Sequence, residues 1–162
     1  MDKIKKIVSL DASTTCTGIG IYTDNLYNDS CIVETDKKIK GDDKLNQMIS
    51  LIIKKLNMEE PDTVVCEKIV SVRNAQTTRM LQELTGAIRG YCVEHDIEYI
   101  NLSPSTWRSV IVNTYKQKRG SRKREDQKIW ALHIINNKLG IITESIDLAE
   151  AVLIGEAYVE SR

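Results

Sequence analysis

Four acidic residues of this chain stand where they could act together on a metal ion or a phosphate. Asp11 and Glu67 each follow directly after an apolar run, as a carboxylate does at the end of a buried strand. Asp147 and Glu150 are three residues apart, so both would project from one face of a helix. If that helix crosses the sheet near the strand ends, the four carboxylates converge.

Carboxylates in such a group repel one another in a low-dielectric site, and each raises the pKa of its neighbours unless cations neutralise them. The hard, oxygen-seeking ion Mg²⁺ is the natural guest, with Mn²⁺ as a substitute. Two such ions about 4 Å apart can activate a water and stabilise the leaving oxygen of a phosphodiester. The pattern therefore predicts metal-dependent phosphodiester chemistry, with Asp11, Glu67, Asp147 and Glu150 as catalytic metal ligands.

Each acid also has a purely structural explanation. Asp11 could cap the Ser/Thr-rich turn that follows it, and Asp147 could be a first-turn acid favoured by the helix dipole. Glu150 could be solvated, although its neighbours are apolar. Glu67 is harder to explain in this way, because a carboxylate after a continuous apolar run needs a partner. The group of four therefore says more than any single member.

The charge of the chain is unevenly distributed. The formal net charge is zero, yet residues 116–128, here named the basic segment, hold seven basic residues against two acids. One concentrated positive segment in an otherwise acidic chain is typical of an enzyme that holds a polyanion and cuts it with bound cations. The alternative is a solvated surface loop. The candidates for binding a polyanion in this segment are Lys116, Lys118, Arg119, Arg122, Lys123 and Arg124.

The overall composition is that of one globular domain over residues 1–162. No apolar run is long enough to cross a membrane, and the N-terminus lacks the features of a signal peptide. Four cysteines without a CxxC pair favour free thiols in a reducing compartment. We therefore expect a cytoplasmic protein, in the host cytoplasm if the source is a phage or virus.

Apolar periodicity and turn residues define the elements that must position the acids. The expected strands are 4–11, 17–23, about 29–35, 62–68 and 97–102. The expected helices are 42–57, 75–95, a short helix opened by Ser103-Pro104, 124–138 with Ile129, Leu132 and Ile135 inward, and about 144–160. This order predicts an α/β fold with one mixed sheet and helices on both faces.

Taken in order, these motifs resemble the RuvC family of Holliday-junction resolvases, endonucleases with an RNase H-like fold. The motifs that carry the resemblance are Ser9-Leu10-Asp11-Ala12-Ser13 with Thr17-Gly18, Cys66-Glu67-Lys68 with Asn74-Ala75, Thr85-Gly86-Ala87, Gly120-Ser121-Arg122-Lys123, and Asp147-Leu148-Ala149-Glu150-Ala151. The match spans nearly the whole chain. It leaves open whether the source is a bacterium, a phage or another virus.

The resemblance implies a five-stranded RNase H-like sheet, with three antiparallel strands and two parallel ones. It implies that the four acids bind the catalytic metal and that Arg108 and Lys123 contact DNA. It further implies a homodimer formed through helix 75–95, because two active sites must cut two symmetry-related strands of a four-way junction.

Two positions depart from the family pattern. Glu150 stands where many relatives carry Asp, which changes the reach of that ligand by one methylene. Val70 stands at the junction wedge position, where well-studied relatives carry an aromatic that stacks on bases. Base stacking on an aromatic is worth roughly 1–3 kcal/mol. We therefore expect looser selectivity, with cleavage of three-way junctions and forks as well as four-way junctions.

Other functions fit parts of the pattern. The first hairpin also resembles the phosphate-binding hairpin of actin-like ATPases and sugar kinases, but those proteins need a second, similar domain. An RNase H-like nuclease acting on RNA–DNA hybrids and a non-catalytic branched-DNA-binding protein both remain open. His95 and His133 are expected at the surface, and Trp107 and Trp130 in the core.

Overall fold

A mixed five-stranded sheet forms the centre of the computed structural model, which describes residues 5–70, 74–120 and 123–162. The strands are β1 (Lys6–Asp11), β2 (Cys16–Thr23), β3 (Leu26–Glu34), β4 (Thr63–Glu67) and β5 (Glu98–Leu102). Their order across the sheet is β3-β2-β1-β4-β5. β1, β2 and β3 are antiparallel neighbours, whereas β4 runs parallel to β1 and β5 parallel to β4. The predicted mixed sheet is confirmed.

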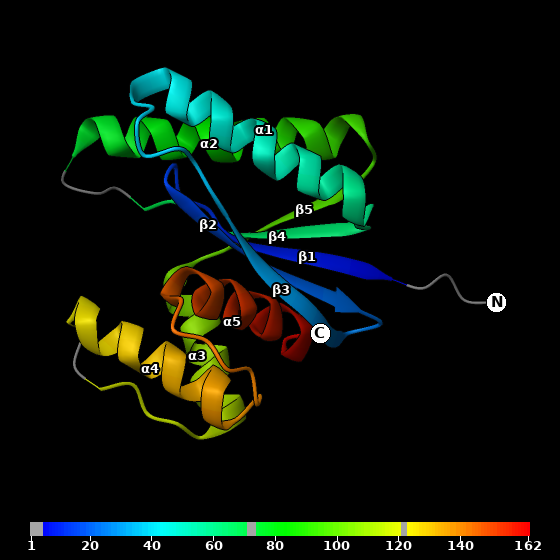
Figure 1. Ribbon diagram of the computed structural model, residues 1–162. Helices are drawn as coiled ribbons and strands as arrows, with labels where there is room; N and C mark the ends of the chain where they lie inside the picture. The colour runs from blue at the N-terminus through cyan, green and yellow to red at the C-terminus, as the bar shows by residue number, and fades with distance from the viewer. Residues whose placement is uncertain (1–4, 71–73, 121–122) are drawn as a thin grey trace.

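Helices cover both faces of the sheet (Figure 1). α1 (Gly41–Glu59) and α2 (Ala75–Glu94) lie on one face, while α3 (Pro104–Tyr115), α4 (Arg124–Asn137) and α5 (Ile146–Glu160) lie on the other. Successive side chains of a strand point to opposite faces of the sheet, so the core is divided into two clusters, one under each layer of helices. Val8 and Leu10 of β1 pack under α1 and α2, whereas Ile7 packs with the α3–α5 layer. Both layers of the predicted architecture are therefore present.

Side-chain caps fix where three of the helices begin. Asn74 accepts a hydrogen bond from the Thr77 amide at the start of α2. Ser103 accepts from the Thr106 amide at the start of α3, where Pro104 occupies the first turn, as the sequence predicts. Ser145 accepts from the Leu148 amide and so sets the first turn of α5.

α5 is the most deeply buried helix and lies directly on β1 and β2. Ser9 Oγ donates to the carbonyl oxygen of Ala151 at 2.7 Å, and the Tyr22 hydroxyl donates to that of Val152 at 2.6 Å. These bonds tie strand side chains to the main chain of the helix. The register of α5 along the sheet is therefore fixed, and with it the position of its acidic first turn.

Some details of the sequence predictions need correction. Ile129 was expected to face inward, but its side chain is 66% exposed, and Trp130 and Ala131 face the core instead. His95 and His133 are exposed and both tryptophans are buried, as predicted. All four cysteines are free, although only Cys66 and Cys92 are fully buried. No helix within the described ranges is long and apolar enough to cross a membrane.

Candidate metal centre and nucleic-acid interface

The parallel pairing of β1 and β4 brings the first two acids to the same edge of the sheet. Leu10 is the register partner of Cys66, and Asp11 and Glu67 each come one residue later. Because parallel strands end at the same edge, the two carboxylates extend from neighbouring strand ends. The two strands that carry these acids are therefore neighbours in the sheet.

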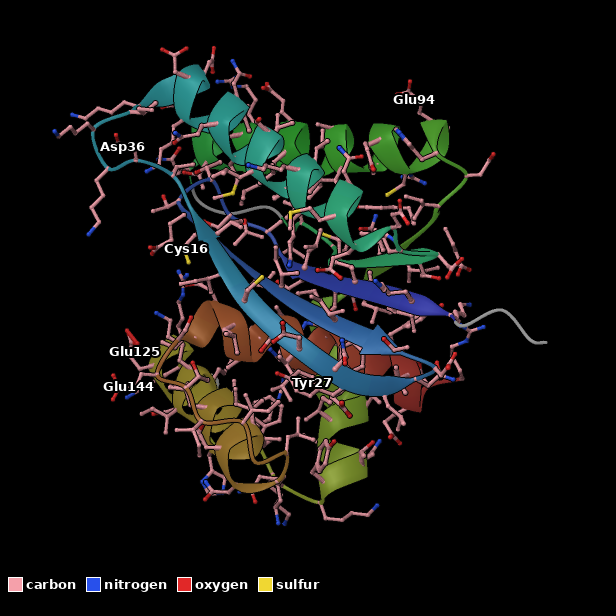
Figure 2. The ribbon with its side chains drawn as sticks, turned by 45° about the vertical axis from the view of Figure 1, so that its right-hand side comes forward. Cys16, Tyr27, Asp36, Glu94, Glu125 and Glu144 are labelled. Carbon is pink, nitrogen blue, oxygen red and sulfur yellow. The ribbon has the colours of Figure 1, made fainter. Side chains whose placement is uncertain are left out.

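The first turn of α5 brings the other two acids to this edge. Gly18, the register partner of Asp11 on β2, is in contact with the main chain of Asp147. Asp147 thus lies over the end of the β1–β2 pair, and Glu150 follows one turn later. Cys16 begins β2 at the same edge (Figure 2), and burial together with the charge of Asp147 raises the pKa of its thiol to about 12.

Burial and nearby negative charge raise the pKa values of Asp11, Glu67 and Glu150. Burial is the largest cause of the raised pKa of Asp11, which lies well above its ordinary value. The charges of Glu150, Glu67 and Asp147 raise that pKa further. The interaction between the Asp11 and Glu150 carboxyl groups raises the pKa of Asp11 and opposes the effect of burial on the pKa of Glu150. Acids from three elements therefore form one interacting group.

Two consecutive residues of α3 supply internal partners for this group. Trp107 Nε1 donates to Glu67 Oε2 at 2.5 Å, which lowers the pKa of Glu67 against the larger, opposing effect of burial. Arg108 Nη2 lies 3.6 Å from Glu150 Oε1 and lowers the pKa of Glu150 against burial in the same way. The structure thus places Arg108, predicted as a DNA contact, directly beside the acids.

The chemistry of the donor set fits a hard divalent cation. All the candidate donors are carboxylate oxygens, which a hard divalent cation prefers. Burial, and after it the charge of neighbouring carboxylates, raises the pKa values of Asp11, Glu67 and Glu150. As the side chains stand, however, no three His, Cys, Asp or Glu residues among those described form a ready-made coordination group. A bound metal would therefore draw the carboxylates together and offset the repulsion among them.

The basic segment begins where α3 ends. Tyr115 donates to the buried Glu156 Oε2 of α5 at 2.9 Å, and Trp130 Nε1 donates to the carbonyl oxygen of Gln117 at 3.2 Å. Both bonds fix the start of the segment against the core. The side chains of Lys116, Lys118, Arg119, Lys123 and Arg124 are exposed, whereas Arg122 lies outside the described residues.

The far end of the basic segment approaches the acids. Arg124 opens α4, and its positive charge contributes to lowering the pKa of Glu150. Glu125 and Glu144 lie at the surface on this side of the molecule (Figure 2). Cationic side chains and the carboxylate group are therefore arranged side by side, as an enzyme acting on a polyanion requires.

Val70 lies just beyond the end of β4, three residues after Glu67, and its side chain is 55% exposed. The predicted wedge position is therefore at the surface and close in sequence to the acids. Residues 71–73, which follow it, lie outside the described ranges. A larger side chain at position 70 would extend into solvent rather than into the core.

Sequence reasoning assigned Trp107 to the core and missed its contact with Glu67. The side chain is fully buried, and its ring centroid lies 6.4 Å from that of Trp130. A buried indole nevertheless needs an acceptor for its N–H group. Because α3 begins at the end of β5, which is next to β4, the carboxylate of Glu67 at the end of β4 is a possible acceptor for this N–H group.

Comparisons with known proteins support the fold. No protein-family model and no curated protein match the chain. Among solved structures, Thermus thermophilus RuvC in complex with a Holliday-junction substrate superposes with a TM-score of 0.69 at 13% identity, over 96% of this chain and 93% of that one. Fowlpox virus resolvase in complex with Holliday-junction DNA gives 0.61 at 16% identity, over 96% and 99%.

The yeast mitochondrial Holliday-junction resolvase Ydc2 gives a TM-score of 0.66 at 12% identity, over 96% of this chain and 78% of that one. The chain therefore has the RNase H-like fold that RuvC shares with other Holliday-junction resolvases. At these identities the similarity is one of fold. Any function must be argued from the residues of this chain.

Proposed function

We propose that this protein is a structure-selective endodeoxyribonuclease that resolves Holliday junctions and other branched DNA by metal-dependent, symmetric nicking. The observation that carries the proposal is the meeting of Asp11, Glu67 and the α5 acids at one edge of the sheet. The resolvase fold of the solved relatives supports the choice of substrate.

Asp11, Glu67, Asp147 and Glu150 would hold Mg²⁺, for which Mn²⁺ substitutes. When bound, the metal supplies Lewis-acid activation of water and of the scissile phosphodiester. The residues of the chain bind and orient the DNA around it. Arg108 lies where its charge can partner a phosphate oxygen once Glu150 binds the metal. The products would be a 5′-phosphate and a 3′-hydroxyl.

The basic segment would bind the phosphate backbone. Its exposed lysines and arginines neutralise phosphates and release counterions, which makes binding sensitive to salt. Phosphate contacts hold the DNA in register but carry no sequence information themselves. Selectivity for a branch point would instead come from the distance and angle between the two active sites of a homodimer.

A homodimer would supply those two sites, as symmetric nicking of a four-way junction requires. The outer face of α2 suits the contact, because nothing lies within 4 Å of a Cβ built at Gly86 or Gly90 and Val93 is 72% exposed. Sedimentation of the purified protein tests this part of the proposal. A monomer at all concentrations would contradict it.

The experiment that tests the proposal is cleavage of a labelled synthetic four-way junction with Mg²⁺. A linear duplex, a fork and an RNA–DNA hybrid serve as alternative substrates, and Asp11→Asn serves as the control variant. We expect paired symmetric nicks at the junction that are absent in Asp11→Asn, which is nearly isosteric and retains DNA binding.

Other outcomes would point to other functions. Cleavage of the hybrid alone would favour an RNase H-type activity. Tight binding without cleavage would mean a non-catalytic branched-DNA-binding protein. Full activity of Asp11→Asn would remove Asp11 from the site.

A further inference from the structure

Trp107 contacts the candidate metal site from inside the core. Its side chain has no exposed surface, and its single polar group, the indole N–H, donates to Glu67 Oε2 at 2.5 Å. A hydrogen bond to a carboxylate is stronger than one between neutral groups. The bond therefore links the packed α3 layer to an acid at the end of β4.

The indole ring is held in place from several sides. The main-chain amide of Trp107 donates to the carbonyl oxygen of Ser103, the residue that caps α3. Trp130 lies beside the ring at a tilt of 32°, and Arg108 places its guanidinium carbon 4.7 Å from the ring centroid. Rotation of the indole would disturb its contacts with Trp130, Arg108 and Glu67, so the N–H direction is fixed before any ligand arrives.

We propose that Trp107 is a positioning residue, which fixes Oε2 of Glu67 and leaves Oε1 available for a divalent cation held together with Asp11 and the α5 acids. This inference rests on the proposed function. A side-chain donor that orients a ligating carboxylate limits the conformations that the ligand must lose on binding metal. In proteins, such outer partners typically contribute 10–100-fold in metal affinity.

Arg108, the residue after Trp107, contacts a second acid of the candidate metal site. Arg108 pairs with Glu150 at 3.6 Å while its guanidinium lies over the Trp107 ring. One turn of α3 therefore contacts an acid of β4 and an acid of α5. Trp107 supports both contacts, directly for Glu67 and through the stacked guanidinium for Glu150.

The chain offers a matched control in Trp130. Its indole N–H donates to the carbonyl oxygen of Gln117 at 3.2 Å, in the same core cluster, so its acceptor is a main-chain carbonyl and not a carboxylate. Trp107→Phe and Trp130→Phe each remove one indole hydrogen bond and some ring volume. Their structural costs are therefore comparable, whereas only the first removes a donor to Glu67.

The test is direct Mn²⁺ binding to the full chain without DNA, measured by calorimetry beside urea unfolding. Trp107→Phe should weaken Mn²⁺ binding on the order of 10–100-fold. Trp130→Phe keeps an aromatic ring beside Trp107 and should leave Mn²⁺ affinity unchanged at a similar loss of stability. If Trp107→Phe fails to fold, β-(3-benzothienyl)alanine at position 107 keeps the fused ring and lacks only the N–H donor, and it should weaken Mn²⁺ binding equally.

Mn²⁺ affinity that is unchanged in the position-107 variants, or equally reduced in Trp130→Phe, would overturn the positioning role and leave the proposed function standing. Absence of Mn²⁺ binding by the wild-type protein would instead overturn the metal site itself, and the inference with it. The two failures are therefore distinguishable in one set of titrations.

Discussion

Gly18 and Asp147 touch through their main chains: a Cβ at position 18 would overlap the carbonyl oxygen of Asp147. Gly18 is also the register partner of Asp11 on the neighbouring strand. The missing side chain of Gly18 therefore determines how closely the first turn of α5 approaches β1 and β2. That approach brings the acids of α5 to the carboxylate of Asp11.

Gly18→Ala should push the first turn of α5 away from the sheet. Overpacking of this kind costs roughly 1–3 kcal/mol of folding free energy. We expect a corresponding loss in urea unfolding, together with weaker Mn²⁺ binding. Gly41→Ala is a suitable control, because Gly41 has a positive φ of 60° at the start of α1, where a Cβ is strained but has nothing within 4 Å of it. Equal losses of Mn²⁺ affinity in the two variants would show that Gly18 has no special role at the site.

The metal-free protein should become less stable as the pH rises from the ordinary carboxyl range toward neutrality. The pKa values of Asp11, Glu67 and Glu150 are raised in the folded state, so the folded chain binds more protons than the unfolded chain in this window. Stability from these groups is therefore present below their unfolded pKa values and is lost as the pH passes through the raised ones.

Asp11→Asn removes one of these charges and should stabilise the metal-free protein at neutral pH, with a gain that shrinks toward about pH 4. Urea unfolding in the presence of a chelator at several pH values measures this. Glu144→Gln, an exposed acid on the same side of the molecule (Figure 2), should show no such trend. If Asp11→Asn raises the free energy of unfolding by the same amount at every pH, repulsion among the ionised carboxylates is not the cause of the gain.

Neutralising Lys123 and Arg124 together should weaken DNA binding and reduce its dependence on salt. Each lost phosphate contact lowers the slope of log affinity against log salt by about 0.9 for duplex DNA. Binding of a four-way junction without divalent metal, measured over a range of salt, tests this. Lys54→Ala, an exposed charge on α1, should leave the slope unchanged. An unaltered slope in the double variant would place the DNA elsewhere.

An aromatic at position 70 should sharpen selectivity for four-way junctions. Val70 is exposed next to the acid-bearing end of β4, and a stacked base contributes roughly 1–3 kcal/mol. We expect Val70→Tyr to favour four-way junctions over forks about tenfold more than the wild type does. Cleavage rates on a panel of branched substrates give the comparison, with Val70→Leu as the aliphatic control. Identical rates on every substrate would refute a wedge at this position.

The sheet and its acids were predictable because their signals are local. Asp11 and Glu67 each follow an apolar run, and a crossover helix between the two runs implies parallel neighbours, whose ends meet at one edge. The spacing of Asp147 and Glu150 places them on one helix face. Each of these features can be read from a few neighbouring residues, together with the general rules for how strands and helices are connected.

The partners of the acids were not predictable in this way. Trp107 reaches Glu67 across forty residues of sequence, and Arg108 turns toward Glu150 rather than outward. Ile129 was assigned to the wrong side because the helix 124–138 holds apolar residues on more than one face. The packing of α4 against α5 and against Trp107 of α3 places Trp130 and Ala131 in the core.

The four acids come together only when α5 docks on β1 and β2. Asp11 is synthesised long before α5, and the acids that complete its group arrive only when α5 has been made and has settled on the sheet. A partly folded chain therefore has no complete group of acids, and transient undocking of α5 takes the group apart. Nuclease activity would thus be confined to molecules that have finished folding, so unfinished chains would not nick the DNA around them.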